Sequence, residues 1–306
     1  MKKLFSVITL FCMVQCANKT EMHSPQFLDS CNYKNAILVL DKYIEYDSLN
    51  YLYYKYKGVI YNKLSMPDLA ILNLVFANSD LKKRRKVDAE IYYELGVSFD
   101  LKKSDDCAKG MFYIAYYNDS TNLKYIKTLA EKNYHMEDYK SAMTYVNKSL
   151  TIDSSDAHSY FLQGSIYYNE SLYDKALTSI NKGLKYSPYE AWAYLSKGLV
   201  YYALDDFYEA YRSFSFAILL KPNVADFYQQ RAYTLLASGF PKSALKDCEK
   251  VIELDSTFAE AYHLKAIIFA KYYNKNMGCR LYEKYKKMNH GFHQDTIFRY
   301  CDNINN

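Results

Sequence analysis

Cysteine and histidine are the residue types in this chain that could carry chemistry, and their spacing argues against a catalytic or metal site. The 306-residue chain has six His and seven Cys, but it contains no CxxC pair and only His290 and His293 lie close together. The GxGxxG, P-loop, HExxH and GxSxG motifs are absent from the sequence. We therefore predict no enzymatic activity, no cofactor, no metal and no small-molecule substrate, and we interpret the His290/His293 pair as a polar loop.

The N-terminus has the pattern of an export signal. Met1-Lys2-Lys3 is basic, and the apolar run Leu4–Val14 is shorter than the roughly 20 residues that a membrane-spanning helix needs. Cys16 follows this run, and the segment resembles a bacterial lipoprotein signal. The resemblance implies that residues 1–15 are removed, that Cys16 carries a lipid and that residues 16–26 are a linker. The predicted location is the bacterial envelope, anchored in the membrane (the outer membrane is favoured) and facing the periplasm. The alternative is a soluble periplasmic or secreted protein.

Five cysteines remain beyond the predicted signal and its lipidated residue. Their odd number and wide spacing are not typical of a disulfide framework. We expect buried free thiols, with a single disulfide as the alternative. The five residues are Cys31, Cys107, Cys248, Cys279 and Cys301.

Composition favours helices joined by short connections. The chain has 36 Tyr but only 9 Gly and 5 Pro, too few turn-forming residues for an all-β protein of this length. Half of the residues are hydrophobic and 24% are charged, which excludes a disordered, collagen-like or polytopic membrane protein. The net charge of +5 is too mild to indicate a nucleic-acid partner.

A repeat of 34 residues organises most of the chain. Small residues recur at positions 8 and 20 of seven frames, which begin at residues 51, 89, 123, 157, 191, 225 and 259. Aromatic or aliphatic residues recur at positions 4, 11 and 24, with Asn133 at position 11 and Cys248 at position 24 as exceptions. Positions 4, 8 and 11 share one face of a first helix, and positions 20 and 24 share one face of a second. Small residues at 8 and 20 would let the two helices approach closely. Pro188 and Pro222 fall where the second helix should end, and Pro67 and Pro241 where it should begin.

This pattern resembles the tetratricopeptide repeat (TPR) family over roughly residues 51–290. The resemblance implies an all-α solenoid of tandem antiparallel helix pairs, with about seven repeats and caps. We interpret residues 27–50 as an N-terminal half-repeat and residues 291–306 as a C-terminal capping helix and tail. The family's carboxylate-binding members have Asn at position 9, which no frame has here, so the resemblance does not extend to that type of clamp.

The resemblance also implies a concave groove lined by the first helices. In frames 157, 191 and 225 the groove positions are largely aromatic and apolar, and such residues dominate binding hot spots. The hypothesis is a non-enzymatic scaffold or adaptor that binds an apolar segment of another, unidentified envelope protein. Alternatives are glycan or peptidoglycan binding, and an accessory subunit of an envelope enzyme complex. The candidate groove residues are His158, Phe161, Tyr168, Trp192, Leu195, Tyr202, Asp226, Gln229 and Tyr233.

A run of five basic residues interrupts the repeats between frames 51 and 89. We interpret it as a solvated connection. The alternative is contact with anionic lipid headgroups, which a lipid on Cys16 would place within reach. The run comprises Lys82, Lys83, Arg84, Arg85 and Lys86.

Overall fold

The computed structural model describes residues 30–83, 86–288 and 301, and these residues form fifteen α-helices and no β-strand. The predicted all-α class is therefore confirmed. A π-helical segment, Phe269–Tyr273, follows α15. The helices are α2 (Ser30–Tyr46), α3 (Tyr51–Lys63), α4 (Pro67–Lys83), α5 (Ala89–Leu101), α6 (Asp105–Asn118), α7 (Leu123–His135), α8 (Tyr139–Ile152), α9 (Ala157–Asn169), α10 (Tyr173–Tyr186), α11 (Ala191–Ala203), α12 (Phe207–Leu220), α13 (Ala225–Ala237), α14 (Pro241–Leu254), α15 (Ala259–Ile268) and α16 (Lys275–Met288).

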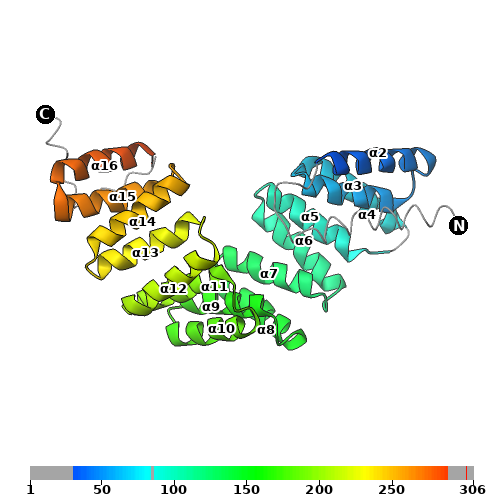
Figure 1. Cartoon of the computed structure of the whole chain (residues 1–306). Coiled ribbons are helices and arrows are strands. Elements are labelled where there is room, and N and C mark those ends of the chain that lie inside the picture. The colour runs from blue at the N-terminus through cyan, green and yellow to red at the C-terminus, as the bar shows by residue number, and fades with distance from the viewer. Residues whose placement is uncertain (1–29, 84–85, 289–300, 302–306) are drawn as a thin grey trace. The chain divides into compact units, whose positions relative to one another are not determined.

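Helix boundaries follow the sequence repeat. The first helices α3, α5, α7, α9, α11, α13 and α15 each begin at position 1 of a predicted frame. Six of them, all except α7, pair with the helix that follows, as in α3 with α4 and α9 with α10 (Figure 1). Pro67 and Pro241 are the first residues of α4 and α14, and Pro188 and Pro222 follow the ends of α10 and α12. These roles were predicted from the absence of an amide hydrogen in proline.

The chain divides into two compact units, residues 1–145 and 146–306, and the boundary falls within α8. The first unit contains α2 to α7 and the second contains α9 to α16. Within the described residues no helix is both long and apolar enough to cross a membrane. The predicted signal, Cys16 and the linker lie outside the described residues, while α2 lies within the predicted half-repeat.

Close contact between paired helices depends on the small residue at position 8. A Cβ atom on Gly198 would lie 2.5 Å from the ring of Phe214, which stands at position 24 of the same frame. In frame 51, a Cβ on Gly58 would lie 2.4 Å from Leu74. The residue at position 24 therefore fills the space that the small residue leaves, which confirms the predicted close approach and identifies its partner.

The turn between paired helices uses a left-handed residue at position 15. In six hairpins this residue has a φ between 55° and 80°, and only Gly239 is a glycine. In the α9–α10 hairpin the amide of Leu172, at position 16, donates to the carbonyl of Tyr167 at position 11, as in a Schellman motif. The other five residues with positive φ are Ser65, Lys103, Glu137, Ser171 and Asp205.

Tyrosine at position 4 ties each repeat of the second unit to the turn before it. The hydroxyl of Tyr194 donates to the carbonyl of Pro188 at 3.0 Å, and that of Tyr228 donates to the carbonyl of Pro222 at 3.1 Å. Tyr160 and Tyr262 make the equivalent bond at 3.3 and 3.4 Å. These four tyrosines therefore have a structural role.

A disulfide joins Cys279 to Cys301, so the prediction that these two residues are free thiols is wrong. Cys279 lies in α16, and Cys301 packs with it in a buried cluster that includes Tyr262, Tyr282 and Tyr285. Sequence spacing could not show that the chain brings a residue beyond α16 back to this cluster. The other residues of the predicted C-terminal cap lie outside the described residues.

Cys107 and Cys248 are free thiols, but only Cys248 is buried. Burial of Cys248 raises the pKa of its thiol to about 12, which makes it unreactive. Cys107 is exposed, contrary to the expectation of a buried thiol.

Candidate functional site

The predicted groove residues lie on three neighbouring first helices of the second unit. Helix α11 contacts α9 on one side and α13 on the other. Trp192 and Tyr202 lie near opposite ends of α11 and remain 45% and 37% exposed. His158 on α9 and Asp226 on α13 are also exposed. We call these four residues the first-helix surface.

Each aromatic ring of the first-helix surface packs against a second aromatic ring. The ring of Trp192 lies 5.0 Å from that of the buried Phe227, at an angle of 73°. The ring of Tyr202 lies 5.5 Å from that of Phe207 at the start of α12. An exposed ring whose orientation is already fixed by packing loses little conformational entropy when a partner covers it. The geometry suits a binding anchor as well as it suits packing.

Several predicted groove residues serve packing instead. Phe161 lies against Gly183, where an added Cβ would approach its ring to 2.4 Å. Leu195 packs against the Ala191, Ala217 and Phe227 cluster. Tyr168 is half-buried, with its ring 6.0 Å from that of Tyr173.

Two further predicted groove residues are half-buried or buried. Tyr233 is half-buried against the cluster around Ala232 and Cys248, and this burial raises its pKa. Gln229 is 2% exposed, and its amide makes no hydrogen bond of ordinary geometry with the described residues. Its predicted place in an open groove is therefore corrected. The prediction is wrong because position 5 of α13 lies in the packed interior.

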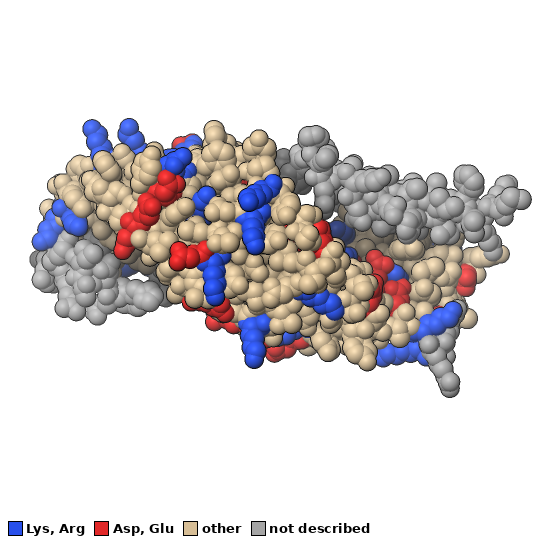
Figure 2. Space-filling model, turned by 90° about the horizontal axis from the view of Figure 1, so that it is seen from below, with Lys and Arg blue, Asp and Glu red and all other residues tan. Residues whose placement is uncertain are grey.

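The remaining predictions are only partly covered by the structure. Lys82 and Lys86 are exposed at the two ends of the basic run, and Arg84 and Arg85 lie outside the described residues. Lys83 is the last residue of α4. His290 and His293 also lie outside the described residues, as does Cys16. On the face drawn in Figure 2, basic and acidic side chains are interspersed among wide uncharged areas.

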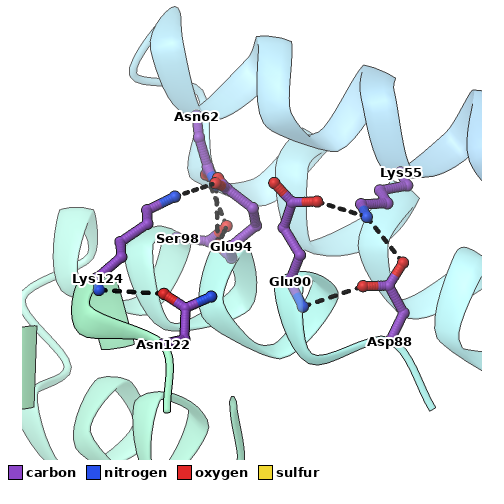
Figure 3. Close-up of polar contacts among 8 residues, drawn as sticks. All are labelled: Lys55, Asn62, Asp88, Glu90, Glu94, Ser98, Asn122 and Lys124. Carbon is purple, nitrogen blue, oxygen red and sulfur yellow. Dashed lines mark hydrogen bonds and ion pairs between the residues drawn. The ribbon is translucent and has the colours of Figure 1, made fainter. Parts of the chain in front are cut away.

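The first unit holds a buried polar cluster that sequence reasoning did not single out (Figure 3). Asn62 of α3 donates to the carboxylate Oε2 of Glu94 at 2.9 Å and to its backbone carbonyl at 2.8 Å. Ser98, one turn later on α5, donates to Oδ1 of Asn62 at 2.7 Å. These bonds fix the amide of Asn62, and the amide in turn fixes one oxygen of the carboxylate.

The other oxygen of Glu94 faces a lysine. Nζ of Lys124, on α7, lies 3.9 Å from Oε1 of Glu94 and 3.9 Å from the ring centroid of Tyr93. Burial raises the pKa of Glu94, while the hydrogen bond from Asn62 and the charge of Lys124 oppose that shift. A buried carboxylate with a raised pKa is a recognised mark of a functional site.

A second ion cluster lies beside this one and is more tightly paired. Lys55 of α3 contacts Asp88 at 2.7 Å and Glu90 at 2.6 Å, and its side chain is only 10% exposed. Burial alone would lower the pKa of Lys55, but its bonds to the two carboxylates outweigh burial and raise it. This lysine is held by two carboxylates, and it links α3 to the start of α5.

The repeat frame contained a signal for the Glu94 cluster. Asn62 and Lys124 occupy positions 12 and 2, which the family resemblance places on the groove side, but Glu94 occupies position 6, which it does not. The contact among frames 51, 89 and 123 depends on side-chain packing, which periodicity does not show.

Replacing Glu94 with Gln is expected to stabilise the protein at neutral pH. Since the folded-state pKa of Glu94 is raised, the native state binds its proton more tightly than the unfolded state does. Stability from this group is therefore lost as the pH rises from the ordinary value of 4.5 through the folded pKa. The neutral amide removes this cost, so urea denaturation at pH 7 should show a higher free energy of unfolding for Glu94→Gln than for wild type.

The gain should shrink as the pH falls to 4, where Glu94 is mostly protonated in both states. Glu45→Gln is a matched control, because Glu45 is exposed on α2. Its effect should be close to zero at both pH values. A Glu94→Gln protein less stable than wild type at pH 7 would contradict this account.

Comparisons with known proteins support the repeat resemblance. Residues 157–190 match the family model described as tetratricopeptide repeat. No curated protein matches the sequence. A TPR protein structure from Parabacteroides merdae aligns with a TM-score of 0.66 at 18% identity, covering 84% of this chain and 99% of that one. The C-terminal part of a TPR repeat-containing protein from Cytophaga hutchinsonii aligns with a TM-score of 0.57 at 22% identity, covering 76% and 94%.

A third solved structure is the APC/C hetero-tetramer Cut9-Hcn1. It aligns with a TM-score of 0.63 at 14% identity, covering 86% of this chain and 52% of that one. At these identities the comparisons establish the fold, a solenoid of tandem helix pairs like those of TPR proteins.

Proposed function

We propose that this protein is a non-enzymatic scaffold that binds an apolar segment of another protein on the first-helix surface. The TPR-like fold supports the general role, since proteins of this fold are typically interaction modules that present extended binding surfaces. The observation that carries the specific proposal is the partial exposure of Trp192 and Tyr202 on one helix, each fixed by a ring beneath it. Tryptophan and tyrosine are enriched among residues that dominate interface energy.

The experiment is in-cell cross-linking followed by affinity capture and mass spectrometry. Wild type is compared with a Trp192→Ala/Tyr202→Ala variant whose helicity is verified by circular dichroism. We expect one captured protein to fall by about tenfold or more in the variant. Tyr189→Ala/Tyr208→Ala is the matched control, since these tyrosines are 77% and 71% exposed outside the first helices. Equal capture by all three proteins would contradict the proposal.

We also propose that the protein acts in the bacterial cell envelope, anchored by a lipid on Cys16. Two independent features support export: the signal-like sequence of residues 1–15 and the Cys279–Cys301 disulfide. Disulfides form and persist in oxidising compartments such as the periplasm. The outer membrane is the favoured site of anchoring.

Cys16→Ser tests the anchor directly. Wild type should sediment with membranes and incorporate labelled palmitate, whereas the variant should do neither. Wild type that is recovered in the soluble fraction without label would contradict the anchor and favour a free periplasmic protein.

Glycan binding receives less support than protein binding. Sugar sites surround an aromatic ring with polar groups, and of the two polar candidates near Trp192 only Asp226 is exposed, because Gln229 is buried. Binding of soluble peptidoglycan fragments that depends on Trp192 would reverse this preference.

A further inference from the structure

We propose that Glu94 and Tyr93 form a recognition site for one basic side chain of a partner protein, and that Lys124 occupies this site in the free protein. The inference rests on the proposed function in one respect, which is that the chain binds segments of other proteins. It concerns the first unit only and adds the chemistry that the segment must carry there, a lysine or an arginine.

The site combines the two features that recognise an organic cation. A carboxylate supplies charge and hydrogen-bond acceptors, and an aromatic face supplies a negative quadrupole. Lys124 shows that both features reach the same point, since its Nζ lies 3.9 Å from Oε1 of Glu94 and 3.9 Å from the centroid of Tyr93. The ring of Tyr93 is itself fixed by stacking on Tyr125, with centroids 5.3 Å apart.

The carboxylate is fixed and buried, but its bond to the resident lysine is incomplete. The side chain of Glu94 is 11% exposed, and Asn62 holds Oε2 at 2.9 Å. At 3.9 Å from Oε1, Nζ of Lys124 is too distant for a hydrogen bond. A partner cation that approaches to normal distance would make a bond that the free protein lacks.

The side chain of Lys124 is free to leave the site. Its side chain is 52% exposed, so it can move into solvent by a change of rotamer without disturbing the core. Its backbone amide is held by Asn122 at the start of α7, and this bond does not depend on the position of Nζ. The site can therefore exchange its occupant while the helix stays in place.

Lys55, in the neighbouring ion cluster, is held more tightly than Lys124. It makes two close ion pairs and is 10% exposed, so both of its carboxylates already have a cation at close distance. The two lysines thus differ in kind: one is a structural link, and the other is a loosely held occupant of a rigid site. This difference singles out Glu94 as the open acceptor.

The test is a selection of random peptides displayed on phage against the immobilised full-length protein. Peptides selected by wild type are then sequenced and measured by fluorescence anisotropy against Glu94→Gln, Lys124→Gln and the control Glu45→Gln. We expect a recurring lysine or arginine among the selected peptides. Its replacement with citrulline or glutamine should weaken binding to wild type by about tenfold or more and leave binding to Glu94→Gln unchanged.

The most informative result is whether Lys124→Gln strengthens or weakens the binding of basic peptides. If Lys124 competes for the site, Lys124→Gln should bind basic peptides about threefold or more tightly than wild type does. If Lys124 instead contacts an acidic partner group, the same substitution should weaken binding. Glu45→Gln should match wild type.

The outcomes separate this inference from the proposed function. Peptides that depend on Trp192 and Tyr202 but show no basic residue sensitive to Glu94 would overturn the inference and leave the proposed function standing. Weaker binding of basic peptides by Lys124→Gln would also overturn it. Failure of wild type to select any peptide would contradict both.

Discussion

Replacing Cys301 with Ser is expected to lower the free energy of unfolding of the C-terminal unit by about 3 kcal/mol. The disulfide spans a sequence separation of 22 residues, and closing a loop of this size restricts the unfolded chain by roughly that amount. Both sulfurs are also buried in the cluster around Tyr262, Tyr282 and Tyr285, so release of Cys301 would open this cluster to water. For a unit of this size the melting temperature should fall by about 6 to 12 °C.

Thermal denaturation of the oxidised protein measures this effect, and Cys107→Ser is its control. Cys107 is an exposed free thiol, and its substitution should leave the melting temperature almost unchanged. Thiol labelling of the denatured, unreduced protein should modify Cys107 and Cys248 but not Cys279 or Cys301. Labelling of all four residues, or equal melting temperatures for the two variants, would contradict the role assigned to the disulfide.

Replacing Gly198 with Ala is expected to destabilise the α11–α12 hairpin, although alanine is the better helix former. Helix propensity favours alanine by about 1 kcal/mol. Against this, the new Cβ would lie 2.5 Å from the ring of Phe214, which is fully buried. Overpacking of this kind costs about 1–3 kcal/mol. The cost should exceed the gain, leaving a net loss of up to about 2 kcal/mol in urea denaturation.

Gly110→Ala is the matched control, because the same substitution should raise the free energy of unfolding instead of lowering it. Gly110 lies within α6, and a Cβ there would meet nothing within 4 Å. Propensity alone should then stabilise the protein by up to about 1 kcal/mol. Adding Phe214→Leu to Gly198→Ala should recover part of the loss. Stabilisation by Gly198→Ala would show that the helices do not approach as closely as the structure indicates.

The repeat was the most predictable feature of this chain. Packing of two helices requires small residues at fixed positions, and the sequence has such residues there, for example Gly198 and Ala210. The seven frame starts and the roles of four prolines followed from it. The left-handed residue at position 15 could not be predicted from the repeat. Ser171 and Glu137 have no intrinsic preference for positive φ, and they adopt it because the helices on both sides impose it.

The candidate sites were less predictable, because exposure depends on tertiary packing. Trp192 and Tyr202 were expected at the surface and are there, whereas Phe161 fills the space above Gly183 and Gln229 is buried. The Glu94 cluster joins residues from three helices, and no single frame contains its pattern. The disulfide was missed for a related reason, since only the folded chain brings Cys301 to Cys279.

The most direct test of the central claim is site-specific photo-crosslinking in living cells. A photoreactive phenylalanine replaces Tyr202 on α11 in one protein and Tyr208 on α12 in another. Both tyrosines are exposed, at 37% and 71%, so accessibility alone would favour Tyr208. If the first helices carry the binding surface, a discrete cross-linked protein should appear from position 202 and not from position 208. Cross-linking from 208 alone, or from neither position, would contradict the claim.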